Sequence, residues 1–375
     1  MASANSRRAS ATRVVTASPD RVPVPAGLAC GGQLLAHVAD DRQRALKGAM
    51  IADALRRIGK VTIEAPIAMR GGPADGYRTR ARIHVRGGRA GFFAEGTHEL
   101  CDLTESRQLT AASVATIERL NEALVALAPG IEAEIEWVED VPGTTRVAHV
   151  TVARVDAARA VARLEGCQGL DGVSCSVAGD TREAGRHLWG ATRVVDRLDG
   201  PGGPPVTVAH GARAFFQGNR YLLGPLIEDV VARLEGEVLD LYAGVGLFAL
   251  AAAAHGHTVT AVEGDRASAV DLVDNAAAGA GVTAVHGAVE AHFAGPRHAV
   301  GTVLVDPPRT GLSAEALAGV LAWAPPHIVY VSCDPATLAR DLRRCLDAGY
   351  TLGVVRGFDL FPRTGHVETV ITLTR

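Results

Sequence analysis

The chain has 375 residues, of which 47% are hydrophobic and 21% charged, and its formal net charge is −3 at pH 7. This length allows two or three domains with buried cores. The charge balance excludes nucleic-acid binding through overall positive charge, so any such site has to be a local basic patch. Six cysteines without regular spacing do not form the disulfide framework of a small secreted domain.

The first 60 residues divide into a polar segment and a helical one. Residues 1–27 are polar and contain three prolines, so we expect no stable fold there. Apolar side chains from Leu34 to Ile58 recur at helical spacing, with Lys and Arg on the other face, which predicts an amphipathic helix. The chain has no secretory h-region and no apolar run that could span a membrane, so we expect a cytoplasmic protein.

Strands and helices alternate from Gly76 to about Leu188. Residues 77–85 alternate at period two, which would place four basic residues on one strand face: Arg78, Arg80, Arg82 and His84. We also predict a helix over residues 113–127 and strands over residues 131–138 and 146–155. The Gly- and Pro-rich run at 200–205 is either a hairpin loop or a linker, and periodicity does not decide between them.

Strands and helices also alternate from about residue 237 onward, in the manner of a parallel, doubly wound α/β sheet. The predicted strands are 238–242, 259–263, 284–286, 302–306, 328–332, 351–358 and 367–373. We therefore divide the chain into an N-terminal segment with its helix (1–59), an α+β central domain (60–199) and a Rossmann-like domain with its lead-in segment (200–375).

A glycine loop follows the first strand of this sheet, in the run from Asp240 to Gly246 (DLYAGVG). Glycines there let a ligand approach the backbone closely. Glu263 ends the next strand, where a carboxylate can accept hydrogen bonds from both ribose hydroxyls of a nucleoside cofactor. Ala249 stands where a dinucleotide fingerprint has Gly or Ala, so this loop alone leaves both NAD and S-adenosylmethionine open.

Cys333 lies between a predicted strand and a predicted helix. Asp334 is a natural N-cap, and Pro335 suits the first helical position. The helix dipole there is expected to lower the thiol pKa and favour a thiolate nucleophile, although an isolated cysteine is more often a buried structural residue. Asp306 ends another strand at the same sheet edge, where ligands bind, although Asp306-Pro307-Pro308 could also be an ordinary turn.

Five segments in order carry a resemblance to a known family. They are AFFQGN (214–219), DLYAGVG (240–246), DPPR (306–309), SCDPATLARD (332–341) and GHVETV (365–370). Together they resemble the S-adenosylmethionine-dependent RNA 5-methyluridine methyltransferases, which methylate a uridine in the tRNA T-loop or in large-subunit ribosomal RNA. Each segment alone is modest evidence, but five in order are specific. The run GYRTR (76–80) is similar to the start of that family's central domain.

The resemblance implies a role for each residue of the site. Cys333 would add to carbon 6 of uracil and turn the ring into an enolate that attacks the sulfonium methyl group. Glu368 would remove the proton left on carbon 5, and Asp306 would hydrogen-bond the uracil edge. The residues implied for S-adenosylmethionine are Gln217, Tyr242, Gly244, Gly246, Glu263 and Asp306. Taken alone, Glu368 could be a solvated carboxylate on an edge strand, and Gln217 a helix-capping residue.

The chain departs from the family at an iron–sulfur motif. Many members carry C-x5-C-G-G-C with a fourth cysteine near the central domain, whereas here Cys30-Gly31-Gly32 is followed by Gln33. Val24 stands six positions before Cys30, and Ser106 occupies the neighbourhood of the fourth ligand, with Cys101 five residues away. A cluster needs about four thiolates, so we expect no iron–sulfur cluster and no metal.

RNA recognition is expected to come from a local basic patch. The family's N-terminal β-barrel is missing or reduced to a stub before Pro19, either because this member has lost it or because the start of the chain is incomplete. The candidate phosphate contacts are Arg78, Arg80, Arg82, Arg86 and Arg89, although a solvated strand face would look the same. We expect a monomer that acts on a uridine flipped out of an RNA loop.

Three functions compete at this point. The first is methylation of an RNA uridine at carbon 5. The second is methylation of another substrate, such as a free nucleobase or a small molecule. The third is RNA binding without catalysis by a protein that has kept the fold. The presence of Cys333, Glu368, Asp306 and Gln217 together favours an enzyme, and the sequence does not identify which RNA it modifies.

Overall fold

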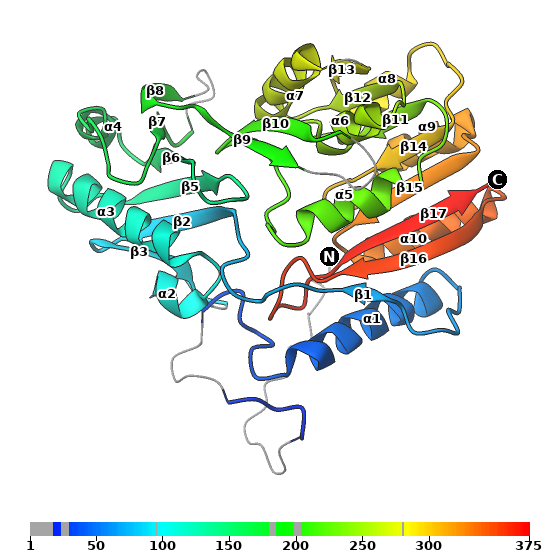
Figure 1. The fold of residues 1–375 in the computed structure, drawn as a ribbon, viewed down its shortest axis with the longest axis horizontal. Helices are drawn as coiled ribbons and strands as arrows, with labels where there is room; N and C mark the ends of the chain where they lie inside the picture. The colour runs from blue at the N-terminus through cyan, green and yellow to red at the C-terminus, as the bar shows by residue number, and fades with distance from the viewer. Residues whose placement is uncertain (1–17, 24–29, 95, 180–184, 199–203, 280) are drawn as a thin grey trace, which may run out of the picture.

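The computed structural model describes residues 18–23, 30–94, 96–179, 185–198, 204–279 and 281–375. Two large sheets, each covered by helices, lie side by side (Figure 1). The expectation for residues 1–17 and 24–27 lies outside the described part of the chain. No helix of the described residues is both long and apolar enough to cross a membrane.

The larger sheet has eight strands in the order β1-β16-β17-β15-β14-β11-β12-β13. Their bounds are Met69–Arg70 (β1), Val238–Leu241 (β11), Val259–Glu263 (β12), Val282–His286 (β13), Thr302–Val305 (β14), His327–Ser332 (β15), Thr351–Phe358 (β16) and Glu368–Thr374 (β17). The strands from β13 to β15 are parallel, and β17 runs antiparallel between β15 and β16. Every strand predicted in this part is present within two residues of its expected ends, which confirms the doubly wound α/β fold.

Helices cover both faces of this sheet because alternate strand residues point to opposite sides. Val329 and Val331 of β15 belong to one buried cluster, whereas Ile328 and Tyr330 belong to the other. The first cluster includes residues of α5 (Leu223–Val231), α6 (Leu247–Ala254) and α7 (Arg266–Ala278). The second includes residues of α8 (Val289–Phe293), α9 (Ala314–Trp323) and α10 (Pro335–Asp347).

The N-terminal helix packs on the larger sheet. Helix α1 runs over Asp40–Arg57, so it starts after the predicted first residue, Leu34. Residues 34–37 form a turn before it. Two acidic residues in its first turn and two basic residues in its last turn complement the helix dipole. Ile51 and Leu55 are fully buried in the second cluster, α1 contacts α10, and β1 pairs with β16. The structure thus attaches α1 and β1 to the larger sheet; the domain division at residue 59 stays a prediction.

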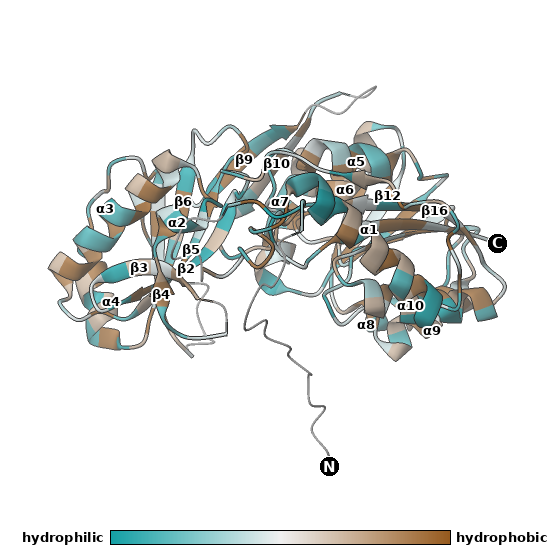
Figure 2. Cartoon of the chain, turned by 90° about the horizontal axis from the view of Figure 1, so that it is seen from below, coloured by the Kyte–Doolittle hydropathy of each residue, from teal (hydrophilic) through white to brown (hydrophobic). Residues whose placement is uncertain are grey.

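The smaller sheet forms the central body, with strands in the order β4-β3-β2-β5-β6-β7-β8. Their bounds are Arg80–Arg86 (β2), Arg89–Phe93 (β3), Leu100–Cys101 (β4), Ala133–Glu139 (β5), Arg146–Val152 (β6), Gly172–Val177 (β7) and Arg186–Gly190 (β8). Its helices are α2 (Leu103–Ser106), α3 (Ala111–Leu127) and α4 (Val155–Val161). Ile83, Ile117 and Trp137 lie fully buried between sheet and helices. Figure 2 shows α3 with hydrophilic and hydrophobic residues side by side, as an amphipathic helix requires.

Two sequence predictions in this body are refined. The helix predicted over 113–127 is α3, capped by the Thr110 side chain, which accepts from the backbone N–H of Ser113. The strand predicted over 146–155 is too long, since β6 ends at Val152 and α4 begins at Val155 with Asp156 in its first turn. An acidic residue there favours a helix start over a continued strand.

A hairpin connects the two bodies. Strand β9 (Arg193–Leu198) pairs antiparallel with β10 (Val206–Gly211), and Leu198 lies opposite Val206. The strands on either side of the Gly- and Pro-rich run at 200–205 thus pair with each other, and residues 199–203 themselves lie outside the described part. The hairpin leads from the central body toward α5 and the larger sheet (Figure 1).

Candidate active site

The glycine loop lies between β11 and α6, at the edge of the sheet where the parallel strands end. Gly244 and Gly246 have φ values of 58° and 94°, and a Cβ on Gly246 would lie 2.8 Å from Leu272 Cδ1. Gly246 is therefore required both by its backbone conformation and by the lack of space for a side chain. The carboxylate of Glu263 at the end of β12 braces the loop, because its Oε2 accepts from the N–H of Gly244 at 2.7 Å. Burial raises the pKa of this carboxyl group above its ordinary value.

Asp240 is a residue of this region that the sequence analysis did not assign to the site. It is fully buried near the end of β11, and neither carboxylate oxygen has a hydrogen-bond partner among the described residues. Burial, and then repulsion by Asp306 and Glu263, raise its pKa well above the ordinary value. A buried carboxyl group without a partner is costly and fits a site that a ligand completes. Its place in the DLYAGVG run was the signal available in the sequence.

Gln217 and Asp306 meet beside the glycine loop. The Gln217 Nε2 donates to Asp306 Oδ2 at 3.0 Å, although 89 positions separate the two residues. Burial raises the pKa of Asp306 to about 7, and the hydrogen bond from Gln217 opposes that shift. Both residues line one hollow together with Phe215, Tyr242 and Gly244. Of the cofactor residues predicted from the sequence, Gln217, Tyr242 and Gly244 share this hollow with Asp306. Gly246 and Glu263 do not line it, although Glu263 accepts from the N–H of Gly244.

Cys333 follows β15 and precedes α10, as predicted. The Asp334 side chain caps α10 by accepting from the N–H groups of Ala336 at 2.9 Å and Thr337 at 2.8 Å. The prediction that the helix dipole lowers the pKa of Cys333 is wrong. Burial, and then the charges of Glu368 and Asp306, raise the pKa of this thiol to about 11. Removal from water and two nearby carboxyl groups outweigh the partial charge of one helix end.

Glu368 lies next to Cys333 because their strands are neighbours. It begins β17, and the following residue, Thr369, pairs with Ser332 of β15. The Glu368 side chain is 2% exposed, and its Oε1 has no hydrogen-bond partner among the described residues. Burial first, and then repulsion by Asp306, raise its pKa well above the ordinary value, whereas Arg309 opposes the shift. Cys333, Glu368 and Asp306 thus form one cluster of titratable groups.

The four basic residues predicted to share one strand face are only partly exposed. Arg80, Arg82 and His84 share one face of β2, whereas Arg78 lies before the strand. Arg78 donates to Arg80 O at 2.7 Å, and Arg80 is partly buried and donates to Ala212 O of the β10–α5 segment at 3.2 Å. Arg78 and Arg80 therefore already donate hydrogen bonds to backbone carbonyls of the protein.

Further out on the same strand and its neighbour, the basic side chains reach solvent. Arg82 is exposed and forms ion pairs with Glu134 and Glu136. Arg86 is exposed, with its guanidinium 5.2 Å from the centre of the Phe93 ring. Arg89 is also exposed, at the start of β3. The predicted phosphate contacts are therefore accessible at Arg82, Arg86 and Arg89.

A cavity of about 600 Å³ lies where the central body meets α7 and β10. Arg193, Arg213 and Arg266 line it, together with the imidazole of His149. Arg193 pairs with Asp271 and Asp274, whereas Arg213 and Arg266 are exposed and have no ion-pair partner among the described residues. Burial lowers the pKa of His149 to about 4, so this imidazole adds no charge near neutral pH. The cavity is one that sequence periodicity did not reveal, since its basic residues come from separate elements.

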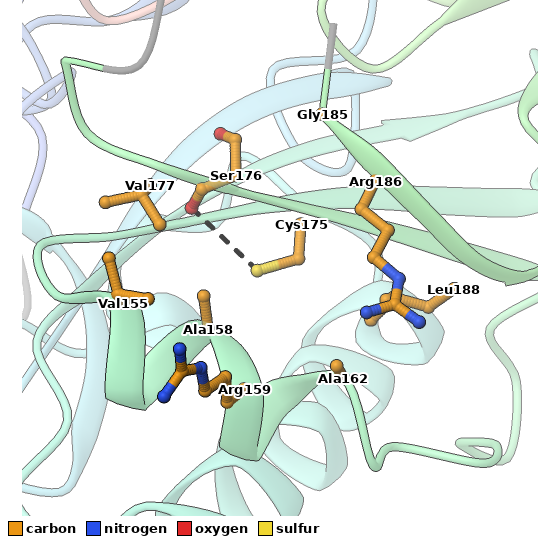
Figure 3. Close-up of a pocket in the computed structure, with 10 residues that line it drawn as sticks. All are labelled: Val155, Ala158, Arg159, Ala162, Cys175, Ser176, Val177, Gly185, Arg186 and Leu188. Atoms are coloured by element: carbon orange, nitrogen blue, oxygen red, sulfur yellow. Dashed lines mark hydrogen bonds between the residues drawn. The ribbon is translucent and has the colours of Figure 1, made fainter. Parts of the chain in front are cut away.

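A smaller cavity of about 170 Å³ lies inside the central body, between α4 and β7 (Figure 3). Most of its lining is aliphatic, and Arg159 and Arg186 are its two charged residues. The Cys175 thiol contacts Ser176 O at 3.8 Å, and burial raises its pKa to about 11. No acid or base accompanies the thiol in this lining, so the cavity does not resemble a catalytic site.

The region in which the sequence departs from the iron–sulfur motif contains a disulfide. Cys30 and Cys101 are joined to each other, and the Gln33 Nε2 donates to Ser106 O. The described residues include no group of three or more His, Cys, Asp or Glu side chains that could hold a metal ion. Val24 lies outside the described part. Two sulfurs joined to each other do not fit a cluster that needs about four thiolates.

Comparisons with known proteins find relatives along nearly the whole chain. A sequence model of the tRNA (uracil-5-)-methyltransferase family matches residues 294–375. The chain is 33% identical over 386 residues to the 23S rRNA (uracil(1939)-C(5))-methyltransferase RlmD of Methylococcus capsulatus, covering 96% of this chain and 85% of the relative. It is 32% identical to the enzyme of the same name from Pseudomonas putida, with 96% and 81% covered.

A solved structure has the same fold over nearly the whole chain. It is the tRNA (uracil-54, C5)-methyltransferase of Pyrococcus abyssi in complex with S-adenosyl-L-homocysteine. The TM-score is 0.74 at 24% sequence identity, and the match covers 96% of this chain and 88% of that one. The likeness therefore includes both the central body and the larger sheet.

Proposed function

Because the chain belongs to the S-adenosylmethionine-dependent RNA uracil-C5 methyltransferases, we propose that it methylates a uridine in ribosomal or transfer RNA through a covalent adduct with Cys333. The observation that carries the proposal is the cluster of Cys333, Glu368 and Asp306 beside the glycine loop. Methylation of a small molecule, and RNA binding without catalysis, are less well supported, because the cluster is complete and the relatives' names describe RNA enzymes.

The residues around the glycine loop fit S-adenosylmethionine, which supplies an electrophilic methyl group when it is bound. Gly244 and Gly246 give the loop the positive φ values on which its turn beside the proposed cofactor site depends. Each oxygen of Glu263 keeps a lone pair for a ribose hydroxyl after accepting from the backbone. Asp240 offers a buried carboxyl group whose oxygens have no hydrogen-bond partner among the described residues, which suits a ligand donor or a ligand cation. The Pyrococcus abyssi enzyme, whose fold this chain shares, binds S-adenosyl-L-homocysteine.

Cys333 makes the ring of the uridine nucleophilic. Carbon 5 of uracil does not attack a methyl group unaided, but thiolate addition at carbon 6 converts the ring into an enolate. With a pKa of about 11, the thiol is protonated in the free protein near neutral pH, so its proton has to pass to a base as the ring is attacked, and the ionised carboxylate of nearby Asp306 can accept it. Asp306, with a pKa of about 7, can donate to uracil O4 when protonated and accept from uracil N3–H when ionised.

Glu368 completes the reaction by removing a proton. After methyl transfer, carbon 5 carries both the methyl group and its original hydrogen, and the thiolate cannot leave until that hydrogen is removed as a proton. The raised pKa of Glu368 suits a base that acts in a dry pocket, and its Oε1 has no competing partner among the described residues. Proton loss then forms the carbon 5–carbon 6 double bond and releases Cys333.

The basic cavity and the β2 face are the proposed RNA contacts. Arg213 and Arg266 offer two guanidinium groups that have no ion-pair partner in the described part of the chain, and Arg266 follows Glu263, the proposed ribose contact, by three residues. Arg86 and Arg89 add exposed positive charge on the central body, whereas Glu134 and Glu136 offset the charge of Arg82. Arg78 and Arg80 remain predicted substrate contacts through donors that their protein partners leave unused. We propose that the target uridine is flipped out of a loop to reach Cys333.

Tritium release tests this function directly. Ribosomal and transfer RNA transcripts containing uridine labelled with tritium at carbon 5 would be incubated with the protein and S-adenosylmethionine. The expected result is tritium in the water and an equal amount of 5-methyluridine in one of the two RNAs. Methyl transfer to RNA without tritium release would place the methyl group on another atom and refute the proposal.

A further inference from the structure

Helix α1 carries a lysine that is buried instead of solvated. Lys47 is fully buried, and its Nζ donates to Asp359 Oδ1 at 2.5 Å and to Phe361 O at 2.8 Å. A buried ion pair is rarely worth more than well-packed apolar side chains in its place, because both charges lose their water. The pair is therefore better explained by the geometry that it imposes than by the stability that it adds.

The partners of Lys47 belong to the segment that leads to the proposed base. Residues 359–367, here called the 359–367 loop, connect β16 to β17, and β17 begins with Glu368. In the pairing of these strands Phe358 lies opposite Glu368, so Asp359 is adjacent to the cross-strand neighbour of the base. Lys47 consequently fixes the backbone at the point where Glu368 enters the sheet.

The loop is held by further contacts from distant parts of the chain. Gln43, four positions before Lys47 on α1, accepts from the N–H of Arg363 at 2.8 Å. The N–H of Leu35 donates to the carbonyl of Arg363 at 2.7 Å, and Asn219 Nδ2 donates to Leu360 O at 2.8 Å. Arg363 has a φ of 63°, which a residue other than glycine adopts only when its surroundings impose it.

Glu368 depends on this backbone support. Its Oε1 has no hydrogen-bond partner among the described residues, so no side chain there steers that oxygen. The position of the carboxyl group follows from where β17 begins, and the pairing of β17 with β15 and β16 sets that point together with the 359–367 loop. A displacement of about 1 Å at a reacting group lowers a rate by about 10²-fold. A change at Lys47 can therefore reach the proton-transfer step without touching RNA or cofactor.

We propose that Lys47 is a positioning residue for proton abstraction: through Asp359 and Phe361 it holds the 359–367 loop, and so holds Glu368 against the substrate. This inference rests on the proposed covalent function. The step it concerns is the loss of the carbon 5 proton to Glu368, with expulsion of Cys333 as thiolate. Methyl transfer itself, which precedes that step, does not require Glu368 and should not require Lys47.

The test compares Lys47→Met with Arg57→Met, a change of an exposed cation on the same helix. Single-turnover reactions with methyl-labelled S-adenosylmethionine would follow the covalent RNA–protein adduct and free methylated RNA separately. For Lys47→Met, methyl should enter the adduct within about twofold of the wild-type rate, while release of methylated RNA slows by about 10²-fold. The KM values for RNA and cofactor should stay unchanged, and Arg57→Met should behave as wild type.

A general loss of structure would give a different pattern. Equal slowing of methyl transfer and release, or release at the wild-type rate, would overturn the inference. If Lys47→Met fails to fold, the double variant Lys47→Met/Asp359→Leu takes its place, because it buries no unpaired charge. The same rates of adduct formation and of release are expected for it. If the proposed covalent methylation is itself wrong, the wild-type protein will form no adduct between RNA and Cys333.

Discussion

Reduction of the disulfide between Cys30 and Cys101 should weaken the central body substantially. The two residues are 71 positions apart, and Cys101 ends β4 within the buried core that also contains Trp137. In the chain-entropy description, a cross-link over that separation removes about 4 kcal/mol of unfolded-state entropy at 25 °C. At an m value of about 2 kcal/mol/M, the urea midpoint should fall by about 2 M on reduction.

Fluorescence of the fully buried Trp137 reports this transition, since the indole enters water when the core opens. Cys30→Ser and Cys101→Ser should each reproduce the reduced protein, because either change removes the same cross-link. Cys167→Ser is the matched control, as Cys167 is a half-buried free cysteine of the same body. Equal urea midpoints for oxidised and reduced protein would refute the reasoning.

Three further predictions concern the site. Alkylation of Cys333, followed by mass spectrometry of its peptide, should rise with pH to a midpoint near 11, because the thiolate forms only above the raised pKa; a midpoint below 9 would contradict this. Calorimetry should detect S-adenosylmethionine binding at the glycine loop and no competition by NAD, whereas NAD binding without S-adenosylmethionine binding would refute the cofactor assignment. Protein purified without oxygen should be colourless, and stoichiometric iron and sulfide would show that the assignment of Gln33 and Ser106 to ligand positions is wrong.

The sequence predicted those parts of the fold that depend on local pattern. Apolar, β-branched runs such as residues 328–332 can hardly be anything but buried strands between two helical layers. The N-cap at Asp334 and the glycine requirement at Gly246 are also local, since the helix start and the positive φ concern a few adjacent residues. Such features could be recognised without knowing what lies nearby in space.

The features that the sequence did not predict depend on contacts between distant segments. Lys47 belongs to a class of side chains expected on the solvated face of α1, yet Asp359, 312 positions away, makes its burial possible. Arg80 likewise lies on the alternating face of β2, but Ala212 of another element covers it. The pKa of Cys333 was predicted with the wrong sign because the helix start is visible in the sequence, whereas the approach of Glu368 is not.

The covalent adduct is the most direct test of the central claim, that Cys333 attacks the uridine and Glu368 releases it. Glu368→Gln protein would be incubated with RNA and methyl-labelled S-adenosylmethionine and then run on a denaturing gel, beside Cys333→Ala. The control is Cys345→Ala, a change of a buried free cysteine in α10. The account predicts a labelled RNA–protein complex that survives denaturation with Glu368→Gln, neither complex nor methylation with Cys333→Ala, and normal turnover with Cys345→Ala. Free methylated RNA at the wild-type rate from Glu368→Gln, or activity in Cys333→Ala, would contradict it.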